Sequence, residues 1–162
     1  MPVSTQERPV LHIVGADDAD RAVVAERRRR LSVTDMSPVT ERLYRFGAAA
    51  LVLVTGLVHL DLYLTDSYDR IPDIGVLFLA NVVTGVVLAA GLVIWPRSVT
   101  VAAGLLFSVG TLVAYVLSRT GGILGYREID WRPEAYVAVG VEVVAAVLLL
   151  QILLARLIRS RR

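Results

Sequence analysis

The chain has 162 residues, of which 56% are hydrophobic and 20% are charged. Soluble domains carry about 45–50% apolar and about 25% charged residues, so this composition excludes a disordered chain and argues against a water-soluble domain. The absence of cysteine excludes disulfides, thiolate nucleophiles, cysteine zinc sites and iron–sulfur clusters. All 17 basic residues are arginine, a bias typical of proteins from GC-rich bacteria.

Residues 1–40 are polar, and we expect them to form a cytoplasmic tail that is partly disordered or helical. The tail holds a run of four arginines: Arg27, Arg28, Arg29 and Arg30. We expect this run to set the topology and to contact anionic lipid headgroups, at about 1 kcal/mol per charge. Docking to a protein is the alternative, and nucleic acid is not an expected partner because no binding motif accompanies the charges.

Four apolar blocks follow the tail, at about residues 43–64, 74–95, 99–117 and 135–155. A helix of about 20 apolar residues crosses a bilayer, and each block meets that length. Buried strands would be about 4–8 residues long, and the helices of a soluble protein would show a polar face. The sequence therefore predicts an all-α fold, in which residues 41–162 form a transmembrane four-helix bundle with up-down-up-down topology.

The segments between the blocks contain signals for helix starts and turns. Ser37 and Pro38 are typical of a helix cap and first turn, and Pro72 and Pro133 precede the second and fourth blocks. After the third block, several glycines flank the apolar pair at 123–124. This pattern predicts a turn that packs both apolar side chains over the mouth of the bundle.

The arginines near the ends of the blocks indicate an orientation. Most of them lie on the side that holds both termini and the turn at Arg97, and only Arg70, Arg119, Arg127 and Arg132 lie on the other side. The positive-inside rule then places both termini in the cytoplasm, and we expect a multi-pass protein of a bacterial plasma membrane. The first block starts too late for a secretory signal, so no processing is expected.

Polar residues within the blocks are candidates for function, because they are costly to bury in lipid. Glu142 and Asn81 lie at similar depths from the outer ends of their blocks, and small residues beside Glu142 predict that it faces the bundle interior. We expect a polar cluster that binds a ligand or a proton in the outer half of the bundle. Its predicted members are His59, Asn81, Tyr115 and Glu142, with Arg119 or Asp61 closing its mouth.

The alternative for these polar residues is a purely structural role. Serine, threonine and asparagine in membrane spans commonly hold helices together through hydrogen bonds worth about 0.6–2 kcal/mol each. His59 lies close enough to the predicted interface to be solvated, and Glu142 fits the functional and the structural interpretation equally well.

Several chemistries have no support in the sequence. His59 is the only histidine in an apolar block, whereas a di-haem bundle needs pairs of axial ligands. No phosphate loop, metalloprotease motif or serine-lysine motif is present. We therefore expect no cofactor, no metal and no catalytic residues. A multidrug exporter of the four-span kind is disfavoured, because those proteins carry their membrane glutamate in the first span.

Two stretches carry a resemblance to other proteins: Gly56–Tyr63 continuing through Arg70–Phe78, and Tyr115–Arg119 leading to Gly125–Glu128. They resemble uncharacterised small four-span membrane proteins of GC-rich bacteria, over roughly residues 43–155. The resemblance implies the four-span topology and no activity.

Two functions follow as hypotheses. The sequence favours a non-enzymatic accessory or interaction component of the plasma membrane, with another membrane protein or a second copy of the chain as partner. The alternative is a small-ligand or ion-binding protein, or a proton-linked transporter, that uses the polar cluster.

Overall fold

The structure is a computed structural model, and it describes residues 20–24, 36–129 and 133–161. The chain divides into two units, residues 1–35 and residues 36–162. In the first unit residues 20–24 are helical. The arginine run at 27–30 and most of the predicted tail lie outside the described residues.

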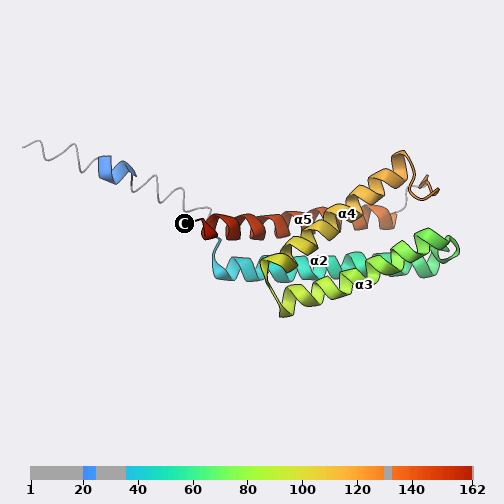
Figure 1. The fold of residues 1–162 in the computed structure, drawn as a ribbon, viewed down its shortest axis with the longest axis horizontal. Coiled ribbons are helices and arrows are strands. Elements are labelled where there is room, and N and C mark those ends of the chain that lie inside the picture. Colours follow the sequence, from blue (N-terminus) through green and yellow to red (C-terminus); the bar gives the residue numbers. More distant parts are fainter. Residues whose placement is uncertain (1–19, 25–35, 130–132, 162) are drawn as a thin grey trace, which may run out of the picture. The chain divides into compact units, whose positions relative to one another are not determined.

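Within its described residues, the second unit contains four long helices, each long and apolar enough to cross a membrane. They are α2 (Pro38–Thr65), α3 (Pro72–Ile94), α4 (Ser98–Thr120) and α5 (Pro133–Ser160), and a short 3-10 helix, η2 (Tyr68–Arg70), joins α2 to α3. Consecutive long helices run in opposite directions (Figure 1). The predicted all-α bundle with up-down-up-down topology is confirmed.

The helices extend beyond the apolar blocks where polar residues stabilise their ends. Ser37 caps α2, since its side chain accepts a hydrogen bond of 3.1 Å from the backbone N–H of Thr40. Pro38 follows in the first turn, as the sequence predicts. At the other end of the bundle, α5 begins at Pro133 with Glu134 in its first turn, where an acid suits the helix dipole.

Packing within the bundle is uneven. Helix α2 packs extensively against α3 and α5, and α4 packs mainly against α5, whereas α3 and α4 touch only sparsely. Figure 1 shows α4 diverging from α3 toward the end that carries η2. We call this end of the bundle the η2 end. The bundle is therefore firmly closed on three sides and weakly closed on the fourth.

Two apolar clusters hold the bundle together, one at each end. The larger cluster joins all four helices near the turn between α3 and α4, with the buried core residues Val52, Leu92, Val101 and Leu149. The smaller cluster joins Leu62, Tyr68 and Ile74 at the η2 end. Between these clusters lie the stretches of helix that carry the predicted polar residues.

Two glycines bring α2 and α3 into close contact. A Cβ atom added at Gly85 would lie 3.2 Å from the carbonyl oxygen of Val52 and 3.4 Å from the Cα of Gly56. Small residues at such a crossing allow helix backbones to approach closely, which is how helices commonly pack in lipid. This contact fixes the position of α3 relative to α2.

An ionic contact joins the first and last helices at the end opposite η2. Arg156 donates from Nε and Nη2 to Oε1 of Glu41, at 2.9 Å and 2.6 Å. Arg159 lies 3.6 Å from the other carboxylate oxygen of Glu41, and it also donates to the backbone oxygen of Met36 at 3.2 Å. Hydrogen bonds between charged groups are stronger than neutral ones, so this contact stabilises the α2–α5 pair.

Candidate functional site

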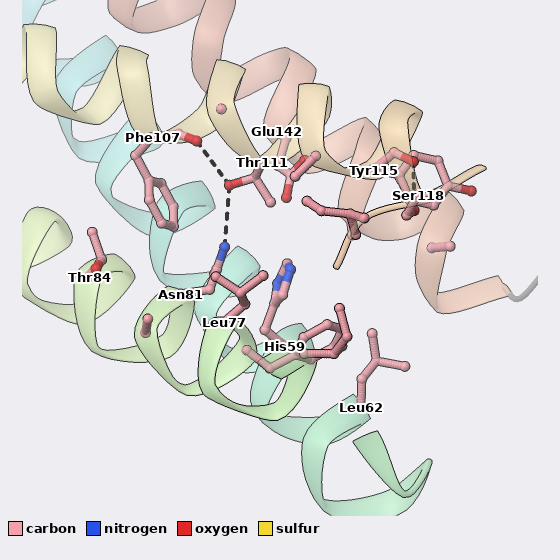
Figure 2. Close-up of a pocket in the computed structure, with 18 of the residues that line it drawn as sticks. His59, Leu62, Leu77, Asn81, Thr84, Phe107, Thr111, Tyr115, Ser118 and Glu142 are labelled. Carbon is pink, nitrogen blue, oxygen red and sulfur yellow. Dashed lines mark hydrogen bonds between the residues drawn. The ribbon is translucent and has the colours of Figure 1, made fainter. Parts of the chain in front are cut away.

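A cavity of about 600 Å³ lies between α3 and α4, toward the η2 end (Figure 2). All four long helices contribute to its wall. In the wall, Leu62 of α2 and Glu142 of α5 are buried, whereas Ala80 and Thr84 of α3 and Leu106 of α4 are exposed. The mouth of the cavity therefore opens sideways, between the two helices that touch least.

Asn81 and Thr111 form a hydrogen-bonded relay across this cavity. The hydroxyl of Thr111 donates to the backbone oxygen of Phe107 at 2.9 Å, so it can only accept from Asn81. Asn81 supplies that hydrogen from Nδ2, at 3.3 Å (Figure 2). The relay fixes the orientation of the amide and leaves its Oδ1 buried, with no hydrogen bond from the described residues.

His59 presents one ring nitrogen to the cavity. Its Nδ1 lies 2.9 Å from the backbone oxygen of Thr55, and a carbonyl oxygen only accepts, so Nδ1 carries the hydrogen. In the neutral ring, Nε2 is then an acceptor. The ring also packs against Phe78, with centroids 5.0 Å apart, which holds it in place at the cavity wall.

Glu142 is the more deeply buried of the two wall residues that carry a carboxyl group. It is 1% exposed, and its Oε1 receives no hydrogen bond from the described residues. Ala138 and Ala145, one turn away on either side, are buried on the same face of α5. The prediction that Glu142 faces the bundle interior is confirmed.

The structure brings together four of the six predicted site residues. His59, Asn81, Tyr115 and Glu142 all line the cavity. Asp61 is exposed, and neither it nor Arg119 belongs to the wall. Asp61 follows His59 by two residues, and side chains with that spacing point to different sides of a helix. Neither of the two residues expected at the mouth is therefore part of the wall.

A network of aromatic and acidic side chains covers the cavity at the η2 end, and the sequence did not indicate it. Tyr68 and Tyr126 both donate their hydroxyls to Oε2 of Glu128, at 2.6 Å and 2.7 Å. Tyr68 also stacks on Phe78, with centroids 4.5 Å apart. We call these four residues the tyrosine cap. Burial, together with the hydrogen bond to Glu128, raises the pKa of Tyr68 above its ordinary value.

A tight turn positions the tyrosine cap. Ile123 and Tyr126 exchange backbone hydrogen bonds of 2.7 Å and 2.8 Å. The two residues between them, Leu124 and Gly125, have φ angles of 49° and 77°, as a type I′ turn requires. Ile123 packs against the smaller apolar cluster, as predicted, but Leu124 is 61% exposed. Its predicted packing is wrong because the apex of such a turn points away from the bundle.

Four apolar helices of spanning length around a side-opening cavity define a multi-pass α-helical membrane protein. Comparison of the chain with protein-family models, with curated proteins and with solved structures finds no match. The resemblance to small bacterial four-span proteins stays a prediction. Among the described residues, no three histidine, aspartate or glutamate side chains are grouped so that they could hold a metal ion.

Proposed function

We propose that this protein binds a small molecule inside the membrane, in the cavity between α3 and α4. The observation that carries the proposal is a cavity of about 600 Å³ whose wall holds buried polar atoms without a hydrogen bond from the described residues. Pockets for small molecules measure about 300–1,000 Å³ and combine apolar walls with a few oriented polar groups. This cavity has both properties.

A purely structural role explains only some of the buried polar atoms in the cavity wall. It accounts for Nδ2 of Asn81, which bonds to Thr111 between two helices. It does not account for Oδ1 of Asn81 or Oε1 of Glu142, which are buried and unpaired within the described residues. A buried acceptor without a donor costs about 1–3 kcal/mol, and a ligand that donates to these atoms would recover this free energy.

The position of the mouth indicates how the ligand reaches the cavity. Exposed wall residues of α3 and α4 lie within helices that are apolar enough to cross a membrane. A mouth at this depth faces lipid chains, so the ligand enters from the bilayer. Such a molecule carries an apolar body together with a polar head that donates hydrogen bonds.

Filling the cavity tests this proposal. Ala114 lines the cavity, whereas its neighbour Val113 is exposed and is not part of the wall. The probes are 1-naphthylmethylamine and 1-naphthylmethanol, and native mass spectrometry of the protein released from detergent measures their binding. We expect saturable binding of one molecule per chain, retained in Val113→Phe and lost in Ala114→Phe. Equal binding by both variants, or no saturable binding of either probe, would overturn the proposal.

We also propose that the protein lies in a bacterial plasma membrane with the η2 end outside. The support is the excess of arginine near the opposite end. Because the chain has no cysteine, a single one at Ser67 or Ser160 reports the orientation. An impermeant maleimide should label Ser67→Cys in intact cells and Ser160→Cys only after permeabilisation. Labelling in the reverse order would contradict this orientation.

The accessory role that the sequence favours stays a separate proposal. Its support is the sequence pattern alone, namely four spans with short connections and no motif for catalysis. Mild-detergent purification tests it, because an accessory component should be recovered with a stoichiometric membrane-protein partner. Recovery of the chain without such a partner would count against this role.

A further inference from the structure

We infer that the ligand of this cavity is a protonated primary amine on an apolar body. The inference rests on the proposed binding function and adds the chemical class of the molecule. Three polar atoms carry it: Oε1 of Glu142, Oδ1 of Asn81 and Nε2 of His59. They belong to three different helices, α5, α3 and α2, and their residues all line the same cavity (Figure 2).

The protein itself determines that each of these three atoms accepts, and does not donate, a hydrogen bond. The Thr111 relay keeps Nδ2 of Asn81 occupied and turns Oδ1 away from Thr111. The Thr55 carbonyl keeps the hydrogen of the His59 ring on Nδ1, so Nε2 of the neutral ring accepts. An ionised Glu142 can only accept. The hydroxyl of Tyr115 can act as donor or acceptor, so it does not alter this preference.

The charge of the wall points in the same direction. Among the described residues, those that line the cavity include two carboxylates, Glu142 and Glu128, and no arginine. Glu128 accepts hydrogen bonds from the two tyrosines of the cap, whereas Oε1 of Glu142 accepts none from the described residues. A buried carboxylate is stabilised by a cation with hydrogens to donate. An anionic head would meet like charge here.

A primary ammonium head supplies both requirements. A primary ammonium carries one positive charge and three N–H donors, which suits one carboxylate and two neutral acceptors. An alcohol supplies one donor and no charge, and a quaternary ammonium supplies the charge but no donor. Apolar wall residues such as Leu77, Phe107 and Ala114 surround the polar atoms and suit an apolar body.

The surface near the η2 end would concentrate such cations. From Asp61 to Asp73 the chain carries four aspartates and one arginine, and η2 lies within this segment. A surface with an excess of negative charge raises the local concentration of cations and their rate of association. The negative charge of this surface supports the inference, but the inference itself rests on the polar atoms of the cavity.

Three probes that share one apolar body test the class of the head group. They are 1-naphthylmethylamine, which is protonated at neutral pH, the neutral 1-naphthylmethanol and the quaternary 1-naphthylmethyl-trimethylammonium. Binding to the wild-type chain is measured by native mass spectrometry at neutral pH. We expect the primary amine to bind at least about tenfold more tightly than the alcohol, because a hydrogen bond between charged groups contributes about that much to affinity. The primary amine should also bind more tightly than the quaternary ion.

Substitutions then assign the effect to the cavity. Glu142→Gln should reduce amine binding by about tenfold or more and leave alcohol binding within about twofold. Glu134→Gln, on the same helix but outside the wall, should bind both probes like the wild type. Asn81→Leu removes a neutral acceptor at similar size and should weaken the amine more than the quaternary ion. This second variant keeps the test decisive if Glu142→Gln does not fold.

The outcomes separate this inference from the binding function beneath it. Equal affinity for amine and alcohol, with both lost in Ala114→Phe, would overturn the amine and leave the cavity as a binding site. Tighter binding of the quaternary ion than of the primary amine would show that charge matters and that the N–H donors do not, which also overturns it. Failure of every probe to bind saturably would overturn the binding function itself.

Discussion

The side-chain amide of Asn81 on α3 donates to the hydroxyl of Thr111 on α4, with the two atoms 3.3 Å apart. This bond joins the two neighbouring helices that otherwise touch only sparsely, and it lies in the wall of the cavity. The same contact therefore joins α3 to α4 at the cavity and fixes the orientation of the Asn81 amide.

Removal of the hydrogen bond between Asn81 and Thr111 should destabilise the bundle slightly, and the effects of substituting its two partners should be coupled. Asn81→Leu and Thr111→Val each remove one partner, and hydrogen bonds between membrane helices contribute about 0.6 kcal/mol on average by double-mutant cycles. We expect a coupling free energy of about that size between the two substitutions, measured by reversible unfolding in mixed micelles. Strictly additive effects would show that the bond contributes nothing to stability.

The tyrosine cap should appear in a titration of the phenols. The raised pKa of Tyr68 means that its phenol ionises at a higher pH than an ordinary phenol. Phenolate absorbance should therefore show a late step above about pH 10 that is missing in Tyr68→Phe. Because the unfolded chain loses this proton first, folded stability should fall as the pH rises above about 10.

The matched control for this titration is Tyr136→Phe, because Tyr136 is an exposed residue outside the cap. That variant should keep the late step that Tyr68→Phe lacks. Loss of the late step in Tyr136→Phe, or its persistence in Tyr68→Phe, would contradict the assignment to Tyr68.

Gly75 should be intolerant of even a methyl group. A Cβ at this position would lie 2.9 Å from the backbone oxygen of Tyr68, so η2 would have to move away from α3. We expect Gly75→Ala to lower the unfolding temperature. Gly140→Ala is the control, since its Cβ would meet nothing within 4 Å. There the substitution should stabilise the helix by about 0.5–1 kcal/mol.

Hydrogen exchange shows whether the cap is affected. Backbone amides of η2 should exchange faster in Gly75→Ala than in the wild type, and unchanged exchange there would refute the proposed displacement.

The ionic contact between α2 and α5 should contribute measurably to stability. The side chains of Glu41 and Arg156 are largely buried, at 18% and 17% exposed. Glu41→Gln therefore leaves the Arg156 guanidinium without its carboxylate partner in a largely buried place. Hydrogen bonds to charged groups contribute about 1.5–3 kcal/mol, and we expect a loss in this range on unfolding in detergent. Asp61→Asn, at an exposed site of the same helix, should change stability by less than about 0.5 kcal/mol. Equal losses in both variants would refute a specific contribution of the contact.

Local patterns were sufficient to predict the spans and four polar residues of the cavity wall. Length and hydropathy identify the helices, and the alanines around Glu142 show which face of α5 is buried. The similar depths of Glu142 and Asn81 already indicated that they lie in the same part of the bundle, and both line the cavity. The tyrosine cap could not be found in this way, because Tyr68 and Glu128 are 60 residues apart and no periodicity relates them. The pairing of Glu41 with Arg156 could not be predicted for the same reason, because the two residues are 115 positions apart.

Asp61 and Leu124 lie where residue type alone did not indicate, Asp61 because a helix rotates about 100° per residue and Leu124 because of its turn. Asp61 is close to His59 in sequence but occupies another face, and it is exposed. Leu124 sits at the apex of a turn whose geometry was not evident from its glycines alone. In both cases residue type was a weaker guide than the direction of the side chain.

The uneven packing of the four helices has a consequence for biosynthesis. A ribosome delivers α2 and α3 first, and these two can pack through Gly56 and Gly85 as soon as both are in the bilayer. Helix α4 arrives next, but its main neighbour is α5, which is translated after it. Until α5 is inserted, α4 stays in lipid with little to pack on. The cavity, which needs a wall from α5, is completed only once that helix has been inserted.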